Sequence, residues 1–235
     1  MYKKFKLALA IIFAAFFSGC GGGGVNGVTA FTVVSSTETF QIKAALTNYL
    51  TNTSTLVGRV SGTMSGYPVI GLFTVSQSSI TAGTFEGFSV FLKSITATGS
   101  FVANGVTYPL ARTLVSYFDS NYVPLGEAGG SSYDVVTGSV TIPVTGTIAS
   151  NGNMYSENRY SSITNPILIG TRQTSYVLEP ETASTALFKL IQIERDTSQV
   201  ATDISIVTFR ITPAGAITRL SETSTSDAKV ITVTY

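Results

Sequence analysis

The sequence predicts a mostly β protein: an antiparallel meander that forms a barrel or a strongly curled sheet, with one N-terminal helix. From residue 53 onward, apolar and polar side chains alternate with a period of two, which is typical of strands buried on one face. Short turns, and not helices, separate these segments, which argues against a parallel α/β sheet. A two-sheet β-sandwich is the alternative arrangement of the same strands.

The expected helix precedes the strands. Ser35 and Glu38 have the spacing of a capping box, and the apolar residues that follow recur on one side of a helix. This apolar stripe consists of Ile42, Ala45, Leu46, Tyr49 and Leu50. We expect it to pack against one face or one end of the sheet; a helix of a partner protein is the other way to cover it.

The strands are expected at residues 56–64, 69–76, 84–98, 99–103, 106–117, 133–144, 147–149, 154–162, 167–178, 186–195, 203–212, 216–222 and 229–235. Asn104-Gly105 and Asn151-Gly152 predict type I′ hairpin turns, because both central residues of that turn need positive φ. Pro213-Ala214-Gly215 predicts a third turn. The Asn104-Gly105 turn also sets a register, in which Ala103 pairs with Val106 and Phe101 with Tyr108.

Composition limits the chemistry of this chain. Charged residues are 11% of the sequence and apolar ones 44%, while serine and threonine make up about a quarter. Histidine is absent, which excludes Ser-His-Asp triads, Cys-His dyads and the common zinc sites. The near balance of 14 basic and 13 acidic residues gives no reason to expect a nucleic-acid partner. We therefore expect a non-enzymatic body without a cofactor or metal.

Three acidic segments are the remaining candidates for a site. Glu179-Pro180-Glu181 offers two carboxylates for glycosidase-like chemistry, but the proline between them favours a turn at a strand end. Asp119-Ser120-Asn121 alternates oxygen side chains as calcium loops do, without the later glycine and glutamate of an EF-hand, and also favours a turn. Glu194-Arg195-Asp196 is interpreted as a solvated strand edge.

Aromatic residues form two clusters in the sequence. Core packing explains them most simply, and an apolar pocket for a small hydrophobic ligand inside a barrel is the alternative. The clusters are Phe85, Phe88 and Phe91, and Tyr117, Phe118 and Tyr122.

The N-terminus has the pattern of a secretory signal. Three lysines precede an apolar run at residues 7–17, which is too short to span a bilayer as a helix. The next residues, Phe17-Ser18-Gly19-Cys20, end at the only cysteine of the chain and resemble the lipobox of bacterial lipoproteins. The resemblance implies cleavage between Gly19 and Cys20 and acylation of Cys20, and Gly21 after the cysteine favours delivery to the outer membrane.

These observations divide the chain into a lipoprotein signal peptide (1–19), a lipidated cysteine with a glycine-rich tether (20–28) and a single β-rich domain (29–235). The predicted function is that of a lipoprotein anchored in the bacterial outer membrane, facing the periplasm or the cell surface. Its partners would be the membrane and an envelope protein or a small hydrophobic ligand.

Three other functions stay open. A carrier of a hydrophobic ligand or lipid would hold it in a barrel cavity. A hydrolase would need two facing carboxylates. An outer-membrane barrel is suggested by the alternating C-terminal residues Ile231–Tyr235, which resemble the terminal strand of such barrels.

Overall fold

The computed structural model describes residues 37–129, 132–164 and 166–235, all of which belong to one compact unit, Thr32–Tyr235. The signal peptide and the tether, with Gly19 and Cys20, lie outside the described residues. The helix is α1 (Ile42–Thr51). The strands are β1 (Ser54–Met64), β2 (Tyr67–Gln77), β3 (Thr81–Phe85), β4 (Phe88–Ala103), β5 (Val106–Phe118), β6 (Pro124–Gly129), β7 (Ser132–Thr137), β8 (Asn151–Tyr160), β9 (Leu168–Pro180), β10 (Ala186–Asp196), β11 (Ala201–Ile211), β12 (Ile217–Ser226) and β13 (Lys229–Thr234).

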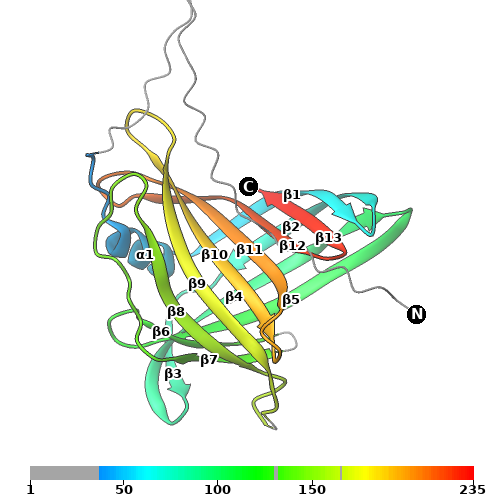
Figure 1. The fold of residues 1–235 in the computed structure, drawn as a ribbon, viewed down its shortest axis with the longest axis horizontal. Coiled ribbons are helices and arrows are strands. Elements are labelled where there is room, and N and C mark those ends of the chain that lie inside the picture. The colour runs from blue at the N-terminus through cyan, green and yellow to red at the C-terminus, as the bar shows by residue number, and fades with distance from the viewer. Residues whose placement is uncertain (1–36, 130–131, 165) are drawn as a thin grey trace, which may run out of the picture. The chain divides into compact units, whose positions relative to one another are not determined.

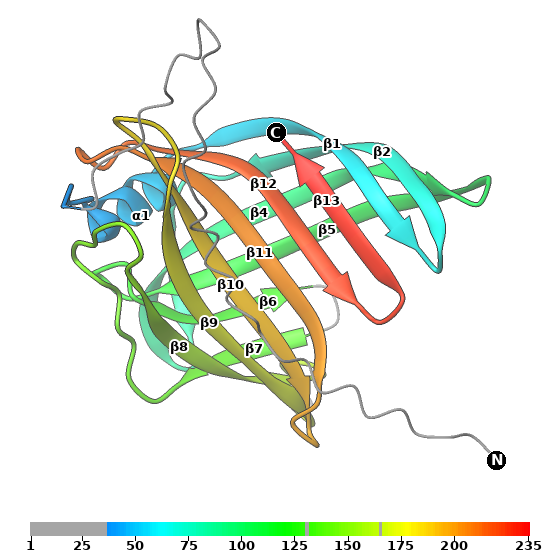
Figure 2. The same ribbon diagram turned by 45° about the horizontal axis from the view of Figure 1, so that its top comes forward.

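Twelve of these strands close into an antiparallel β-barrel (Figures 1 and 2). From β4 to β13, each strand pairs with the next one in the chain. The ring is closed by the pairs β13–β1, β1–β2 and β2–β4. The short strand β3 pairs with the part of β4 that β2 does not reach. The expectation of a barrel is confirmed, and the two-sheet sandwich is not the arrangement adopted.

Helix α1 lies inside the ring, because its side chains contact strands from opposite sides of the barrel. Its buried residues Ile42 and Ala45 pack with Leu178, Phe188 and Phe209 of β9, β10 and β11. Tyr49 accepts a hydrogen bond from a side chain of β2 on the other side of the ring. The predicted apolar stripe is therefore confirmed as a core-packing face.

The start of the helix differs from the prediction. The helix begins at Ile42 after Gln41, whose side chain makes no capping bond, so the helix start expected from the capping box of Ser35 and Glu38 is wrong; Ser35 itself lies outside the described residues. Phe40 instead forms an antiparallel β-bridge with Gly146. This pairing holds the chain in an extended conformation directly before the helix.

Two of the predicted turns are present in the structure. The Asn104-Gly105 turn is confirmed, with Ala103 opposite Val106 and Phe101 opposite Tyr108. Residues 213–215 also form a turn, between β11 and β12, in which Gly215 has φ +85°.

Several other predictions are wrong. The expected strand at 133–144 ends at Thr137, the expected strand at 147–149 is not formed, and β6 was not predicted. The expected strand at 84–98 is broken at Glu86-Gly87, where both residues have positive φ and form the β3–β4 turn, and 99–103 continues β4. Asn151-Gly152 lies inside β8, because residues 138–150 form an irregular connection that pairs with Phe40 and ends in a turn at Ala149 (φ +70°). Tertiary pairing overrides the local turn signal there.

Four glycines bend strands where the sheet curves. They have φ between +140° and +155°, a region that other residues rarely adopt. A Cβ atom on any of them would lie 1.9–2.3 Å from a carbonyl oxygen of the neighbouring strand. They are Gly62, Gly99, Gly129 and Gly170. Curvature of the wall thus depends on the absence of a side chain at these points.

The outer face of the wall carries many hydroxyl groups. Across the strands, Thr55 lies 3.3 Å from Ser76, Thr96 lies 3.2 Å from Thr113, and Thr223 lies 2.9 Å from Thr232 (hydroxyl oxygens). These residues alternate with interior residues along each strand. In the described part of the chain, no helix is long and apolar enough to cross a membrane.

One stretch of the wall has an unpaired edge. β5 pairs with β6 only from Leu114 onward, and among the described residues no strand pairs with that side of 106–113. The carbonyl of Thr113 faces Gly129 of β6, so by alternation the backbone groups of Pro109 also point to the open side. Because proline has no N–H to donate, this edge is a poor template for another strand.

Candidate functional site

The most prominent polar feature of the described residues is a group of charged side chains inside the barrel. We call it the interior ion cluster; its members are Glu127, Asp134, Glu157, Arg159, Arg172 and Glu194, from β6 to β10. Arg172 shares the face of β9 that carries Thr174 and Leu178, and Leu178 packs against α1. The alternation of strand side chains thus directs the cluster into the lumen.

Arg172 is the centre of the cluster. Its Nη1 atom lies 2.8 Å from Glu127 Oε2 and 3.5 Å from Glu157 Oε2. Its Nη2 atom lies 2.9 Å from Asp134 Oδ2 and 3.0 Å from Glu194 Oε1. Four carboxyl groups on four other strands therefore converge on one guanidinium group, which is 5% exposed.

Arg159 is the second cation of the cluster. It pairs with Glu194, and its Nε atom lies 3.7 Å from Asp134 Oδ1, a distance too long for a good hydrogen bond. Two arginines thus face four carboxyl groups in a region largely removed from water. The excess of negative charge decreases when one of the carboxyl groups takes up a proton.

Burial and neighbouring charges shift the titration of these groups. Desolvation, with further contributions from Glu127 and Asp134, raises the pKa of Glu157 to about 8, although Arg172 opposes the shift. Desolvation likewise raises the pKa of Asp134. The carboxyl groups around Arg172 outweigh its own desolvation and raise its pKa, so this arginine stays charged. Glu157 is therefore the acid that holds a proton near neutral pH.

The geometry of the cluster is that of a structural ion network and not of a hydrolytic pair. Every carboxyl group in it contacts an arginine, and Asp134 and Glu157 are only 1% and 2% exposed. Within the described residues, no group of three or more acidic, histidine or cysteine side chains is arranged to hold a metal ion.

A second interior arrangement fixes the C-terminal end of α1. Lys93 of β4 is fully buried, and its Nζ atom donates to the carbonyl oxygens of Leu50 and Asn52, each at 2.6 Å. A cation at this end of a helix also interacts favourably with the helix dipole. Burial lowers the pKa of Lys93. Tyr49 is held by Gln77 and by Arg219, whose Nη1 lies 3.3 Å from the tyrosine hydroxyl.

The acidic segments singled out in the sequence do not form a site together. Glu179 pairs with Lys189 at 2.6 Å, whereas Glu181 pairs with Arg210. The turn interpretation of Asp119 is confirmed, since its Oδ1 atom accepts from the backbone N–H groups of Asn121 and Val123 at 2.8 and 2.9 Å.

The interpretation of Glu194 as a solvated edge residue is wrong. Its side chain belongs to the interior ion cluster, where it contacts both arginines. The alternation along β10 carries the signal that could have placed it there: Glu194 is six residues from Phe188 and shares its face. In the same way, Arg172 is six residues from Leu178 on β9.

The predicted aromatic clusters belong to packing. Phe85 stacks on Tyr117 with ring centroids 4.2 Å apart, and Phe91 stacks on Tyr122 at 5.6 Å. Phe85 ends β3, and Phe88 opposite it begins β4 and is exposed. These rings therefore do not line one shared pocket.

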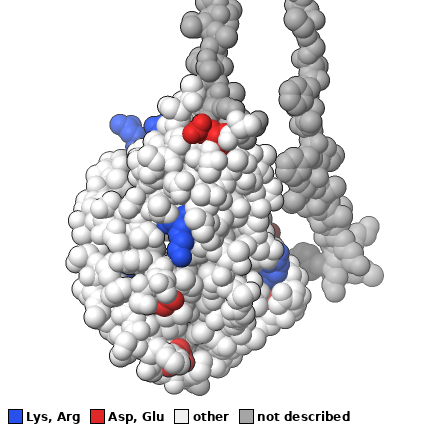
Figure 3. All heavy atoms as spheres, turned by 90° about the vertical axis from the view of Figure 1, so that its left-hand side faces the viewer, with Lys and Arg blue, Asp and Glu red and all other residues white. Residues whose placement is uncertain are grey.

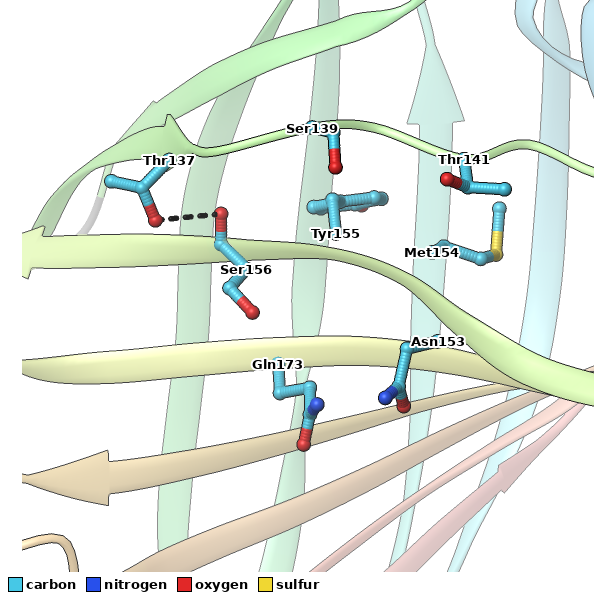
Figure 4. A pocket seen from close by; sticks show the side chains of 8 residues that line it. All are labelled: Thr137, Ser139, Thr141, Asn153, Met154, Tyr155, Ser156 and Gln173. Atoms are coloured by element: carbon cyan, nitrogen blue, oxygen red, sulfur yellow. Dashed lines mark hydrogen bonds between the residues drawn. The ribbon is translucent and has the colours of Figure 1, made fainter.

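Two hollows open on the outside of the barrel. The first has a volume of about 320 Å³ and lies beside β8 (Figure 4). It is lined by Met154 and by neutral polar residues, namely Thr137, Ser139, Thr141, Asn153, Tyr155, Ser156 and Gln173. The second, of about 400 Å³, is apolar and lies at the tips of two hairpins, lined by Tyr67, Pro68, Ile70, Val102, Asn104 and Gly105.

Comparison with known proteins gives no relative for this chain. No family model, no curated protein and no solved structure matches it.

Proposed function

We propose that the protein is a bacterial lipoprotein, held at the outer membrane by acyl chains on Cys20, whose barrel is a non-enzymatic body that contacts other envelope components. The observation that carries the proposal is the N-terminal segment. Lysines, a short apolar run and small residues lead to the only cysteine, which a glycine run follows. Several acyl chains on one residue hold a protein firmly at a bilayer, whereas one chain does not.

The outer face of the barrel supports an anchored body over a membrane-spanning one. A spanning barrel presents lipid with an apolar band roughly 25 Å tall. Here the outward positions in the middle of β1 and β4 include Arg59, Ser61, Thr96 and Thr98. Hydroxyl and guanidinium groups at these positions suit contact with water, so the alternative of an outer-membrane barrel lacks support.

The interior supports a structural or partner-binding role. Helix α1 and its cluster of Phe40, Phe188 and Phe209 occupy one part of the lumen, and the interior ion cluster occupies another. A carrier would need an apolar cavity in the lumen, and the two hollows described above are lined by residues of the outer wall and of the hairpin tips. The carboxyl groups that a hydrolase would need are paired with arginines.

The proposal is tested by metabolic labelling with a palmitate analogue in cells that express the parent chain or Cys20→Ala. We expect label on the parent alone, and we expect the parent to resist extraction from membranes by carbonate while the body of the variant is released. Label on both chains, or on neither, would contradict the proposal. Proteolysis of intact cells in the same experiment distinguishes the periplasmic from the surface-exposed orientation.

A further inference from the structure

The exposed apolar side chains of the barrel gather at one of its two ends. Five turns of the described residues lie there: β1–β2, β4–β5, β8–β9, β10–β11 and β12–β13, which run from the right-hand side of Figure 1 to its bottom. We call this end the turn rim. Helix α1, the β7–β8 connection and the β9–β10 and β11–β12 turns lie at the opposite end, as Figure 2 also shows.

Among the described residues, 15 large apolar side chains are exposed, and 11 of them lie in or within four residues of these five turns. They are Tyr67, Ile70, Val102, Val106, Tyr108, Ile163, Ile167, Leu168, Ile169, Val200 and Val230. By the same criterion, the α1 end and its connections carry three members of this set, Val57, Phe88 and Val144. Exposed apolar side chains that gather at one end of a protein are typical of surfaces that bind another protein, a ligand or a membrane.

Charges are sparse along the rim. The β1–β2, β4–β5 and β8–β9 connections contain no acidic or basic residue. In the β10–β11 turn, the carboxylate of Asp196 accepts from backbone N–H groups of the turn itself. The β12–β13 turn contains the exposed Asp227, and beside this turn Lys229 pairs with Asp203 at 3.3 Å. At the α1 end, shown in Figure 3, charged side chains of both signs lie scattered among neutral ones.

The shape of the rim favours a fluid partner. Its apolar side chains sit on the tips of separate hairpins around a ring, so they offer no continuous flat area to a second protein. A bilayer adapts to such a ring, and Tyr67 and Tyr108 have the amphipathic character of residues at membrane–water interfaces.

The chain before the barrel is long enough to allow this contact. Residues 20–36 lie between the proposed lipid attachment and the described body, and 17 residues span at most about 58 Å. A 13-residue strand such as β5 or β9 spans about 43 Å. An anchor at Cys20 can therefore reach the membrane even when the α1 end points away from it.

We propose that the turn rim enters the boundary between headgroups and acyl chains of a phospholipid bilayer, so that the barrel stands end-on on the membrane that holds Cys20. This inference rests on the proposed lipid anchor. It adds a defined orientation, with the α1 end facing away from the bilayer.

The absence of tryptophan from the chain allows a direct test. Full-length Ile167→Trp and Val106→Trp place one fluorophore on the rim, and Val144→Trp places one at the α1 end at a similar exposure, 65% against 60% and 51%. Each protein, purified from membranes, is reconstituted into vesicles of phosphatidylethanolamine and phosphatidylglycerol with brominated acyl chains. We expect about twofold quenching in both rim variants and almost none in Val144→Trp, because an interfacial segment lies about 5–10 Å deep.

Intact mass of each sample shows whether Cys20 is acylated, which separates the two proposals. Acylated protein with equal quenching in all three variants would overturn the rim contact and leave the anchor standing. Rim quenching in protein without acyl chains would support the rim contact and refute the anchor. A rim fluorescence shift that needs no vesicles and grows with protein concentration would show association of two copies and overturn the proposal.

Discussion

Replacing Glu157 by glutamine should remove most of the pH dependence of the free energy of unfolding between about pH 5 and about pH 9. Glutamine has the shape of the protonated glutamic acid and cannot ionise. Arg172 keeps three carboxyl partners in this variant, namely Glu127, Asp134 and Glu194. The substitution therefore removes one titration and leaves no buried cation without a partner.

The magnitude follows from the pKa of Glu157, which burial raises from 4.5 to about 8. The folded chain binds this proton more tightly than the unfolded chain. The resulting stability is complete below about pH 4.5 and is lost as the pH rises through about 8, at about 1.4 kcal/mol for each pH unit. The total reaches at most about 5 kcal/mol. Asp134, whose pKa is also raised, contributes in the same direction and leaves the variant a smaller slope.

The assay is urea unfolding followed by circular dichroism at a series of pH values, for the parent, Glu157→Gln and the control Glu179→Gln. Glu179 is an outward-facing acid paired with Lys189, so its removal should leave the slope of the parent unchanged. We expect the free energies of unfolding of the parent and of Glu157→Gln to agree near pH 5. At about pH 9 they should differ by several kcal/mol, with the variant more stable. Parallel curves over the whole range would refute the reasoning.

Three further substitutions test other parts of the fold. Gly170→Ala should lower the free energy of unfolding by about 3 kcal/mol or prevent folding, because the new Cβ would lie 1.9 Å from the Arg195 carbonyl oxygen. Gly152→Ala is the control, since the nearest atom to its new Cβ is 3.4 Å away. Equal melting temperatures of the two variants would contradict this prediction. Lys93→Met should cost about 2–4 kcal/mol and speed hydrogen exchange in α1, because the carbonyls of Leu50 and Asn52 lose their donor; unchanged exchange would exclude this role. Pro109→Val should promote self-association in sedimentation at nearly unchanged stability, and a strictly monomeric variant would show that the proline does not protect this edge.

Local patterns in the sequence predicted much of the fold. Alternation of side chains located most strands, and the Asn104-Gly105 turn predicted the pairing of Phe101 with Tyr108 correctly. The helical stripe around Ile42 and Ala45 predicted a buried face. These signals depend on a few neighbouring residues, so they can be recognised without knowing how the rest of the chain folds.

Long-range pairing could not be predicted in the same way. Closure of the barrel depends on pairs such as Val60 with Val233, whose residues are far apart in the sequence. Phe40 forms a bridge with Gly146 in the connection that precedes β8, and Asn151-Gly152 begins that strand in place of forming a turn. The interior ion cluster joins five strands, and its members are recognisable in the sequence only after each is placed on the same face as a core residue such as Leu178.

The proposed attachment to the membrane depends on the chemical state of the N-terminus, which intact-mass spectrometry of protein purified from membranes measures in one step. We predict a chain that begins at Cys20 and carries the added mass of its acyl chains. A chain that retains residues 1–19, or one whose Cys20 carries no acyl group, would contradict the proposed attachment to the membrane.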